Sequence, residues 1–365
     1  MKIIKFFLIL VLSIVLIAVG LVVTLTVLEY KPKAIESVDV EQNQTTQIQL
    51  GQSIKLMTFN IGYASLGSEE DFVMDGGTKG RPDSKDDVLY YFDGIKNVLS
   101  DYPSDFYLLQ EVDLKSRRSF EINQVSGIAE HLGASYSTQF AYNFKAAFVP
   151  FPLSFTDYIG YVESGLSTFT TYRVESSTRY QFPGSFSWPL RVANLKRAMM
   201  VSTHDIEGTD AELFVVNLHM SAYDGDGTLR EQEMAFLKDF MVEQHELGNY
   251  VIIGGDFNQT FPEAVGIFEA KPGLYEAFPI ENDFLPTGFS FMIDTTTPSC
   301  RLLNQPYDEN DENTQYYIID GFILSDNITV LPYDETQTVG EAMTIDLDFE
   351  YSDHHPVVIN VELNG

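Results

Sequence analysis

Polar residues of the types used in phosphate hydrolysis follow several apolar segments of this sequence. They are Asn60, Glu111, Asn217, His219, Asp256, Asn258, Asp320, Asp353 and His354. If the apolar segments are strands, these side chains collect at one edge of a sheet, where a cleft can form. The spacing therefore predicts a polar site built from residues far apart in the sequence.

Attack of water on an anionic phosphoester requires that the negative charge be neutralised. Mg²⁺ prefers one or two carboxylates or amides together with water, and Asn60 and Glu111 suit that role. A second carboxylate can activate the water, and we expect Asp256 to do so, oriented by Asn258.

Two histidines suit the stabilisation of charge on the phosphate oxygens. An imidazolium at His219 or His354 would oppose the charge that develops in the transition state. Asp320 could hold His354 in its protonated, oriented form. The residues therefore indicate metal-assisted hydrolysis.

The elements that must position these residues alternate between strand and helix. The predicted strands are Ser53–Ile61, Asp105–Val112, Arg197–His204, Glu212–Met220, Tyr250–Gly254, Tyr316–Leu324 and Val357–Val361. Arg197–His204 and Glu212–Met220 should form a hairpin around Gly208. Many strands flanked by few helices favour a mixed α/β sandwich.

Two helices are predicted from their caps and apolar spacing. Asp86–Ser100 follows Ser84 as N-cap, with Asp87 as a weaker partner in a capping box. Thr228–Leu247 has Thr228 as its predicted cap and a buried stripe that includes Leu237 and Met241.

The segment 135–188 is rich in aromatic residues and prolines, and it is interpreted as an elaborated loop region on one rim. Its part 148–161 either packs against the domain or forms a wedge that dips into a bilayer surface.

Six motifs occur in order along the chain: TFNI, QEV, NLH, GGDFN, IDGF and SDHHPV. Their order and separation resemble the endonuclease/exonuclease/phosphatase superfamily, over about residues 53–363. The resemblance implies a four-layered α/β sandwich with two packed mixed sheets, here residues 53–365.

The resemblance also implies residue roles. Mg²⁺, with Mn²⁺ as an alternative, would bind Asn60 and Glu111, with Asp353 contributing in some members. Asp256 and Asn258 would lie at the attacking water or the leaving group, with His219, Asp320 and His354 around the phosphate. The remaining candidates are Asn217, beside His219 in the same motif, and Tyr142 and Arg197 as phosphate contacts.

The charge is strongly acidic: 53 Asp and Glu against 22 Lys and Arg give a net charge of −31. Such a surface repels a nucleic-acid backbone at long range, although a bound cation can reverse the potential locally. One cysteine, Cys300, excludes an intramolecular disulfide and a cysteine zinc cluster.

The N-terminus contains 23 uncharged residues from Phe6 to Leu28, about 35 Å as a helix and enough to cross a bilayer. Lys2 and Lys5 before it predict a cytoplasmic N-terminus. We therefore expect a membrane anchor at residues 1–30 and a polar linker at residues 31–52. The protein would be a single-pass protein of the cell membrane, with its catalytic domain on the extracytoplasmic side. A cleaved signal peptide is the alternative.

A membrane anchor and an acidic domain favour a lipid headgroup or a small phosphoester as substrate. The first alternative is an anchored extracellular nuclease, for which Arg179, Arg191, Lys196 and Arg197 are the best basic cluster. The second is a catalytically silent binding module. The oligomeric state is not predicted.

Overall fold

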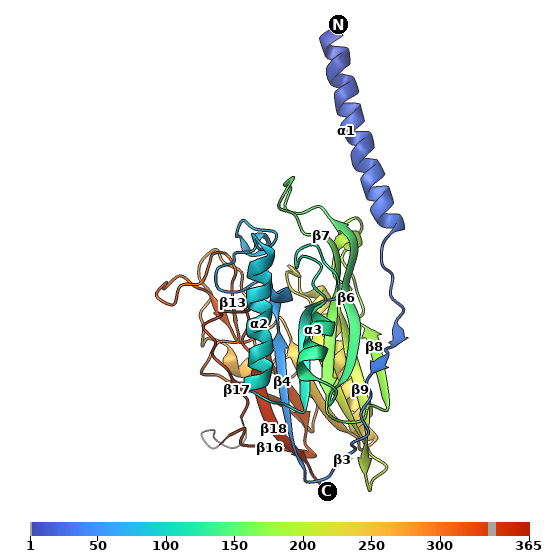
Figure 1. Ribbon diagram of the computed structural model, residues 1–365, viewed down its shortest axis with the longest axis vertical. Coiled ribbons are helices and arrows are strands. Elements are labelled where there is room, and N and C mark those ends of the chain that lie inside the picture. Colours follow the sequence, from blue (N-terminus) through green and yellow to red (C-terminus); the bar gives the residue numbers. More distant parts are fainter. Residues whose placement is uncertain (1, 335–340) are drawn as a thin grey trace.

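Two β-sheets packed face to face form the centre of the computed structural model, which describes residues 2–334 and 341–365 (Figure 1). The first sheet has the spatial order β1 (Ile35–Ser37), β8 (Ser176–Gln181), β9 (Ala198–Glu207), β10 (Glu212–His219), β11 (Tyr250–Asp256), β15 (Asp320–Ser325) and β12 (Phe289–Met292), with β3 (Ile48–Gln49) beside β9.

The second sheet is also mixed. Its order is β16 (Ile328–Leu331), β18 (Val357–Leu363), β4 (Ser53–Asn60), β5 (Phe106–Asp113), β7 (Gly160–Thr170), β6 (Ser137–Val149) and β2 (Val40–Glu41), with β17 (Met343–Thr344) beside β18. A small separate pair contains β13 (Cys300–Arg301) and β14 (Tyr316–Tyr317).

Helices cover the outer faces. They are α2 (Lys85–Asp101), α3 (Gln124–Leu132) and α4 (Thr228–Glu246), with short turns at η1 (Gly62–Ala64), η2 (Val73–Asp75), η3 (Leu190–Ala193) and η4 (Pro262–Ala264), and α1 (Lys2–Val27) outside the domain. Buried residues of α2 and α3 pack on the second sheet, and those of α4 pack on the first. The predicted four-layered sandwich is confirmed.

The core between the sheets comes from alternate residues of each central strand. Leu56, Leu108, Val215, Ile252 and Phe322 are all almost fully buried there. Because successive strand residues point to opposite faces, the remaining apolar residues of these strands pack against the helices. Both faces of each central strand are therefore buried.

Both predicted helices are present, but one cap differs. Ser84 and Asp87 form the predicted capping box of α2. The prediction of Thr228 as the cap of α4 is wrong, because Gly227 is the N-cap residue. Asp224 instead accepts hydrogen bonds from Leu229 N at 2.7 Å and Arg230 N at 3.1 Å. Its carboxylate favours the positive end of the helix dipole.

The interpretation of 135–188 as a loop region is wrong for most of that range. β6, β7 and β8 occupy it, and β6 and β7 pair along most of their length. The aromatic residues of these strands are all buried or half-buried, Phe144 and Phe169 most fully. The irregular parts are the β6–β7 loop at 150–159 and the segment 182–197 that contains η3.

The segment predicted as a polar linker, residues 31–52, contributes three short strands to the sheets. β1 pairs with β8 and β2 pairs with β6, at an edge of each sheet, while β3 pairs with β9. Edge strands present unpaired backbone groups, and this segment pairs with them despite its polar side chains.

Helix α1 projects away from the domain (Figure 1). It is long and apolar enough to cross a membrane, and its length and composition also fit a signal sequence. Its lower end touches the η3 segment: Trp188 Nε1 donates to Thr26 Oγ1 at 3.0 Å. Just beyond the helix, Glu29 pairs with Lys196 at 3.0 Å and Arg191 at 3.3 Å.

Candidate active site

Strand register brings most of the predicted residues to one end of the inter-sheet core. His219 is paired with Asp256 across the parallel strands β10 and β11, and Asp256 is paired with Asp320 of β15. Each is separated by two or four residues from an inner-face core residue of its strand, so its side chain points between the sheets. The site is the last polar layer of that core.

Asp256 is the centre of the cluster and is buried at 1% exposure. Its Oδ2 accepts a hydrogen bond from Asn60 Nδ2 of the opposite sheet at 3.0 Å and lies 3.2 Å from His219 Nε2. Its Oδ1 accepts the backbone N–H of Asn258 at 2.8 Å. Burial, followed by the charge of Asp320, raises the pKa of Asp256 to about 6.

The two histidines have opposite electrostatic environments. Burial, with Arg197 and His354 nearby, lowers the pKa of His219 well below its usual value. Burial also acts to lower the pKa of His354, but Asp320 and the other acidic neighbours raise it well above the usual value. The surroundings therefore favour the charged form of His354 and the neutral form of His219.

Ser299 fixes the carboxylate beside His354. Asp320 Oδ2 lies 2.8 Å from His354 Nδ1 and accepts the Ser299 hydroxyl at 2.8 Å. The same hydroxyl accepts the backbone N–H of Asp320 at 3.0 Å. Ser299 was not predicted, because a serine between Pro298 and Cys300 carries no motif.

Glu111 reaches the site through an irregularity in β5. The pairing of β5 with β7 shifts between Leu109 and Val112, and Glu111 has a φ of 57°. Such a bulge re-aims a side chain that would otherwise face the helices. Burial and the nearby Asp353 raise the pKa of Glu111 to about 7, and burial raises the pKa of Asp353.

Tyr63 and Arg118 support Glu111 and were also not predicted. The Tyr63 hydroxyl donates to Glu111 Oε1 at 2.6 Å. The guanidinium of Arg118 lies over the Tyr63 ring at 3.1 Å and pairs with Asp113 at 3.0 Å. Arg118 is only 4% exposed. Arginine is mostly found at the surface, so the sequence gives no sign that this one is buried beside the site.

Asn217 lies behind the site and not in it. Its side chain donates to the backbone oxygens of Leu109 at 3.1 Å and Ser167 at 3.0 Å, and accepts from Gln110 Nε2 at 2.9 Å. These bonds join the two sheets. Asn258 is half-buried, and its amide donates to Met220 O at 2.9 Å.

The two weaker candidates differ. Arg197 acts electrostatically on both Glu111 and His219, and its buried Nη1 has no hydrogen-bond partner in the described part of the chain. Tyr142 donates to Glu163 at 3.4 Å, and Lys145 lies over its ring. Among residues 2–334 and 341–365, no hydrogen bond joins Tyr142 to Asp256.

Two sets of side chains bring possible metal-ligand atoms within 4.8 Å of one another. One set is Asp256, Asp320 and His354, and the other is Cys300, Asp353 and His354. Cys300 is buried, and burial raises the pKa of its thiol, so it has the character of a small core residue.

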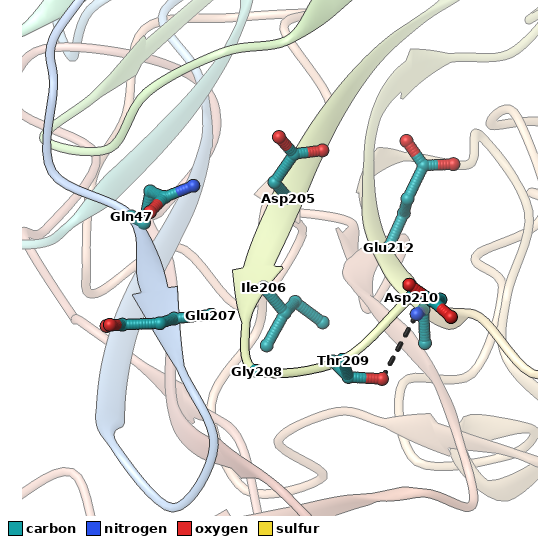
Figure 2. A pocket seen from close by; sticks show the side chains of 9 residues that line it. Gln47, Asp205, Ile206, Glu207, Gly208, Thr209, Asp210 and Glu212 are labelled. Atoms are coloured by element: carbon teal, nitrogen blue, oxygen red, sulfur yellow. Dashed lines mark hydrogen bonds between the residues drawn. The ribbon is translucent and has the colours of Figure 1, made fainter.

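A separate pocket of about 420 Å³ lies at the turn between β9 and β10, at the other end of these strands from His219 (Figure 2). Asp205, Glu207, Asp210 and Glu212 line it with Gln47 and apolar or small residues. Four carboxylates without a cationic side chain repel an anionic phosphate, so this pocket does not extend the site.

Solved structures of three bacterial proteins share the fold. An endonuclease/exonuclease/phosphatase from Beutenbergia cavernae aligns over 86% of this chain and 72% of its own, at 16% identity and a TM-score of 0.57. Proteins of the same description from Leptotrichia buccalis and Bacteroides vulgatus align over 85% and 86% of this chain and all of their own. Their identities are 14% and 16%, and their TM-scores are 0.52 and 0.51.

No protein of curated function matches the sequence. The profile of a family of phosphoester hydrolases, described as the Endonuclease/Exonuclease/phosphatase family, matches residues 57–354. These residues include every member of the cluster around Asp256. The chain belongs to the endonuclease/exonuclease/phosphatase family.

Proposed function

We propose that this protein is a Mg²⁺-dependent phosphoester hydrolase, anchored in a membrane by α1, that acts on a lipid headgroup or a small phosphoester. The observation that carries the proposal is the buried chain of contacts from Asn60 through Asp256 and His354 to Asp320. It combines a carboxylate of raised pKa with a charged imidazole, the pair needed for attack of water on phosphorus.

Glu111 and Asp353 fit a divalent cation. Both carboxyl groups have raised pKa values, and the charge of Asp353 acts on Glu111. Two carboxylates held together in a buried place repel each other unless a cation or a proton offsets them. Glu111 and Asp353, with Asn60, would hold Mg²⁺ or Mn²⁺. When bound, the ion supplies positive charge to the phosphate oxygens.

Asp256 is the proposed general base. Asn60 donates to its Oδ2, His219 Nε2 lies 3.2 Å from the same oxygen, and the backbone of Asn258 donates to its Oδ1, so the carboxylate has a fixed orientation. With a pKa of about 6, it is ionised at neutral pH and still basic enough to take a proton from water.

His354 and Arg197 are the proposed partners of the phosphate. Asp320 holds the His354 ring through Nδ1, which leaves Nε2 to donate toward a phosphoryl oxygen. Arg197 has a buried N–H group with no partner in the described part of the chain, and its charge acts on Glu111. Both cations would oppose charge that develops in the transition state.

The basic cluster considered for nucleic-acid binding does not favour that substrate. Arg179 is 2% exposed and donates to the backbone oxygens of Tyr142 and Lys196. Lys196 and Arg191 both pair with Glu29. These cations are therefore used within the protein, and the chain carries a net charge of −31. A membrane tether would also raise the effective concentration of lipid substrates.

The test compares substrates with the full chain in detergent or in vesicles, with Mg²⁺ or with EDTA. Sphingomyelin and phospholipids, single- and double-stranded DNA, and small phosphomonoesters are supplied in parallel. Release of a lipid headgroup or of free phosphate only with Mg²⁺ supports the proposal. Cleavage of DNA alone would assign the protein to the nucleases, and no hydrolysis with either Mg²⁺ or Mn²⁺ would favour a silent binding module.

A further inference from the structure

The β6–β7 loop, residues 150–159, carries apolar side chains that nothing in the described structure covers. Leu153 is 92% exposed and Phe155 is fully exposed. In Figure 1 the loop rises from the domain at the same end from which α1 projects. Large apolar side chains exposed at a loop tip have a free-energy cost in water, and this cost is removed when they enter a lipid phase.

Hydrogen bonds at its base give the loop a defined shape. The guanidinium of Arg117 donates to the backbone oxygens of Thr156, at 2.9 Å, and Tyr158. Asp157 accepts the backbone N–H of Gly80 at 3.0 Å. The Ser154 hydroxyl accepts the N–H of Asp157 at 3.1 Å. The tip is thus held outward by polar contacts below it.

A second apolar group lies where α1 meets the domain. Trp188 is 54% exposed and Leu190 is 65% exposed, and Trp188 contacts Thr26 of α1. An amphipathic tryptophan at the end of an apolar helix is typical of the membrane–water interface. If α1 spans a bilayer, the same bilayer surface lies over this group and over the tip of the loop.

A cationic pocket lies directly beneath the loop. Arg81, Lys85 and Arg117 line it together with Phe148, Tyr158 and Glu121, among others. Arg117 lies 3.7 Å from the Tyr158 ring centroid and Arg81 lies 4.8 Å from the Phe120 ring. In the described part of the chain no ion pair joins these three cations to a carboxylate, and Glu121 is the one carboxylate among the lining residues.

The pocket has the chemistry of an anion site. Burial and the charge of Arg117 lower the pKa of Arg81, although the charges of Asp157 and Asp83 act in the opposite direction, as expected for two guanidinium groups that lie close together. Glu121, the acidic residue of the lining, accepts a hydrogen bond from the Tyr161 hydroxyl. Basic side chains near a membrane surface attract anionic lipid.

We propose that the β6–β7 loop and the pocket beneath it form a membrane-docking surface: Leu153 and Phe155 enter the bilayer, and Arg81, Lys85 and Arg117 bind the phosphate of an anionic lipid headgroup. This inference rests on the proposed anchoring by α1. Because α1 and the loop lie on one side of the domain, two-point attachment fixes the orientation of the domain on the membrane.

The insertion is tested with the full chain reconstituted in vesicles. Leu153→Cys and Leu247→Cys are labelled with an environment-sensitive fluorophore, and quenching by lipids with brominated acyl chains is measured. Leu247 is a matched control, because it is a leucine with 68% exposure at the end of α4. Quenching at position 153 several times that at position 247 is expected, and equal quenching at both positions would overturn the insertion.

The headgroup site is tested by lipid composition. Vesicles of phosphatidylcholine alone are compared with vesicles that also contain phosphatidylglycerol, which should increase the quenching at position 153 severalfold. The double variant Arg81→Gln/Lys85→Gln should lose that increase, whereas Lys238→Gln on α4 should keep it. Equal quenching in both lipids would overturn the headgroup site. Stabilisation by inorganic phosphate without a phosphatidylglycerol effect would make it a site for free phosphate and overturn the lipid assignment.

The same samples separate this inference from the proposed function. Hydrolysis of a soluble phosphodiester with an unquenched label overturns only the docking surface. A quenched label without hydrolysis of any phosphoester overturns only the catalytic proposal. If neither labelled chain sediments with the vesicles, the anchoring by α1 is wrong, and the docking inference falls with it.

Discussion

His354 and Asp320 form a buried imidazole–carboxylate pair, with 2.8 Å between His354 Nδ1 and Asp320 Oδ2. The other ring nitrogen, Nε2, lies 3.8 Å from Asp256 Oδ2. Burial acts against an imidazolium, yet Asp320 and the other acidic groups raise the pKa of His354 well above its usual value. Asp320 therefore favours the charged form of His354 beside a second carboxylate, Asp256, of raised pKa.

Asp320→Asn should lower turnover by roughly a hundredfold or more, the scale of a lost acid–base contribution. The amide cannot maintain the charge on His354, so the pKa of His354 should fall, and NMR titration of the imidazole measures that fall directly. Asp326→Asn is the control, because Asp326 makes a 2.9 Å contact with His245 at the surface. Unchanged turnover and an unchanged His354 pKa would refute the role of Asp320.

Asp256→Ala should reduce turnover by roughly a thousandfold or more, because it removes the proposed base. The variant should still fold, because the apolar core between the two sheets does not include Asp256 and stays intact. Circular dichroism checks the fold and steady-state kinetics check the rate. Asp210→Asn, at the far turn of β9 and β10, should behave as the wild type. Near-normal turnover in Asp256→Ala would remove this residue from the mechanism.

Glu111→Gln should weaken Mg²⁺ binding by roughly tenfold or more, since even indirect changes at metal sites have effects of that size. Mg²⁺ should raise the unfolding temperature of the wild type, because it binds the folded state, and the rise should shift to higher metal concentration in the variant. Glu246→Gln, exposed at the end of α4, should match the wild type. An identical metal titration in Glu111→Gln would show that Glu111 is not a ligand.

Asn217→Ala should destabilise the protein by about 2–3 kcal/mol, because it removes three buried hydrogen bonds, to Gln110 and to two backbone oxygens, that join the two sheets. Urea unfolding measures the loss, with Asn313→Ala in an exposed turn as the control. The KM for substrate should not change. A large rise in KM without loss of stability would place Asn217 in the substrate site after all.

Motif order predicted the sandwich and the cluster around Asp256, but it could not separate neighbouring roles within one strand. Asn217 and His219 share the inner face of β10, and a step of two residues changes a core position into a site position. The residue at which each strand passes from the core to the site depends on how the two sheets pack against each other. The sequence of a single strand does not determine that packing.

The contacts that hold the Glu111 side chain in the site could not be predicted from the sequence either. A β-bulge and a positive φ turn its side chain toward the site, and Tyr63 and Arg118 hold it there. These features depend on contacts between distant segments. Strand pairing of the polar segment 34–52 was missed for the same reason, because only the open edges of the folded sheets attract it.

Glu233 provides a test of buried charge away from the proposed metal ligands. It is 2% exposed on α4, and burial raises its pKa from 4.5 to about 7 although Ser221 donates to it twice, at 2.6 and 2.8 Å. Between these two pKa values the folded state binds a proton that the unfolded state has lost. Stability from this group is therefore present at low pH and is lost as the pH rises through about 7.

Glu233→Gln should flatten the pH dependence of stability, because the amide does not titrate. Between about pH 5 and about pH 8, the wild type should lose up to about 3 kcal/mol more than the variant, the equivalent of the pKa shift. Urea unfolding in EDTA at both pH values measures the difference. Glu231→Gln, exposed in the first turn of the same helix, should keep the wild-type pH dependence. If Glu233→Gln keeps it as well, the proton is bound elsewhere, and the other buried carboxyl groups with raised pKa, Asp75 and Asp256 among them, become its source.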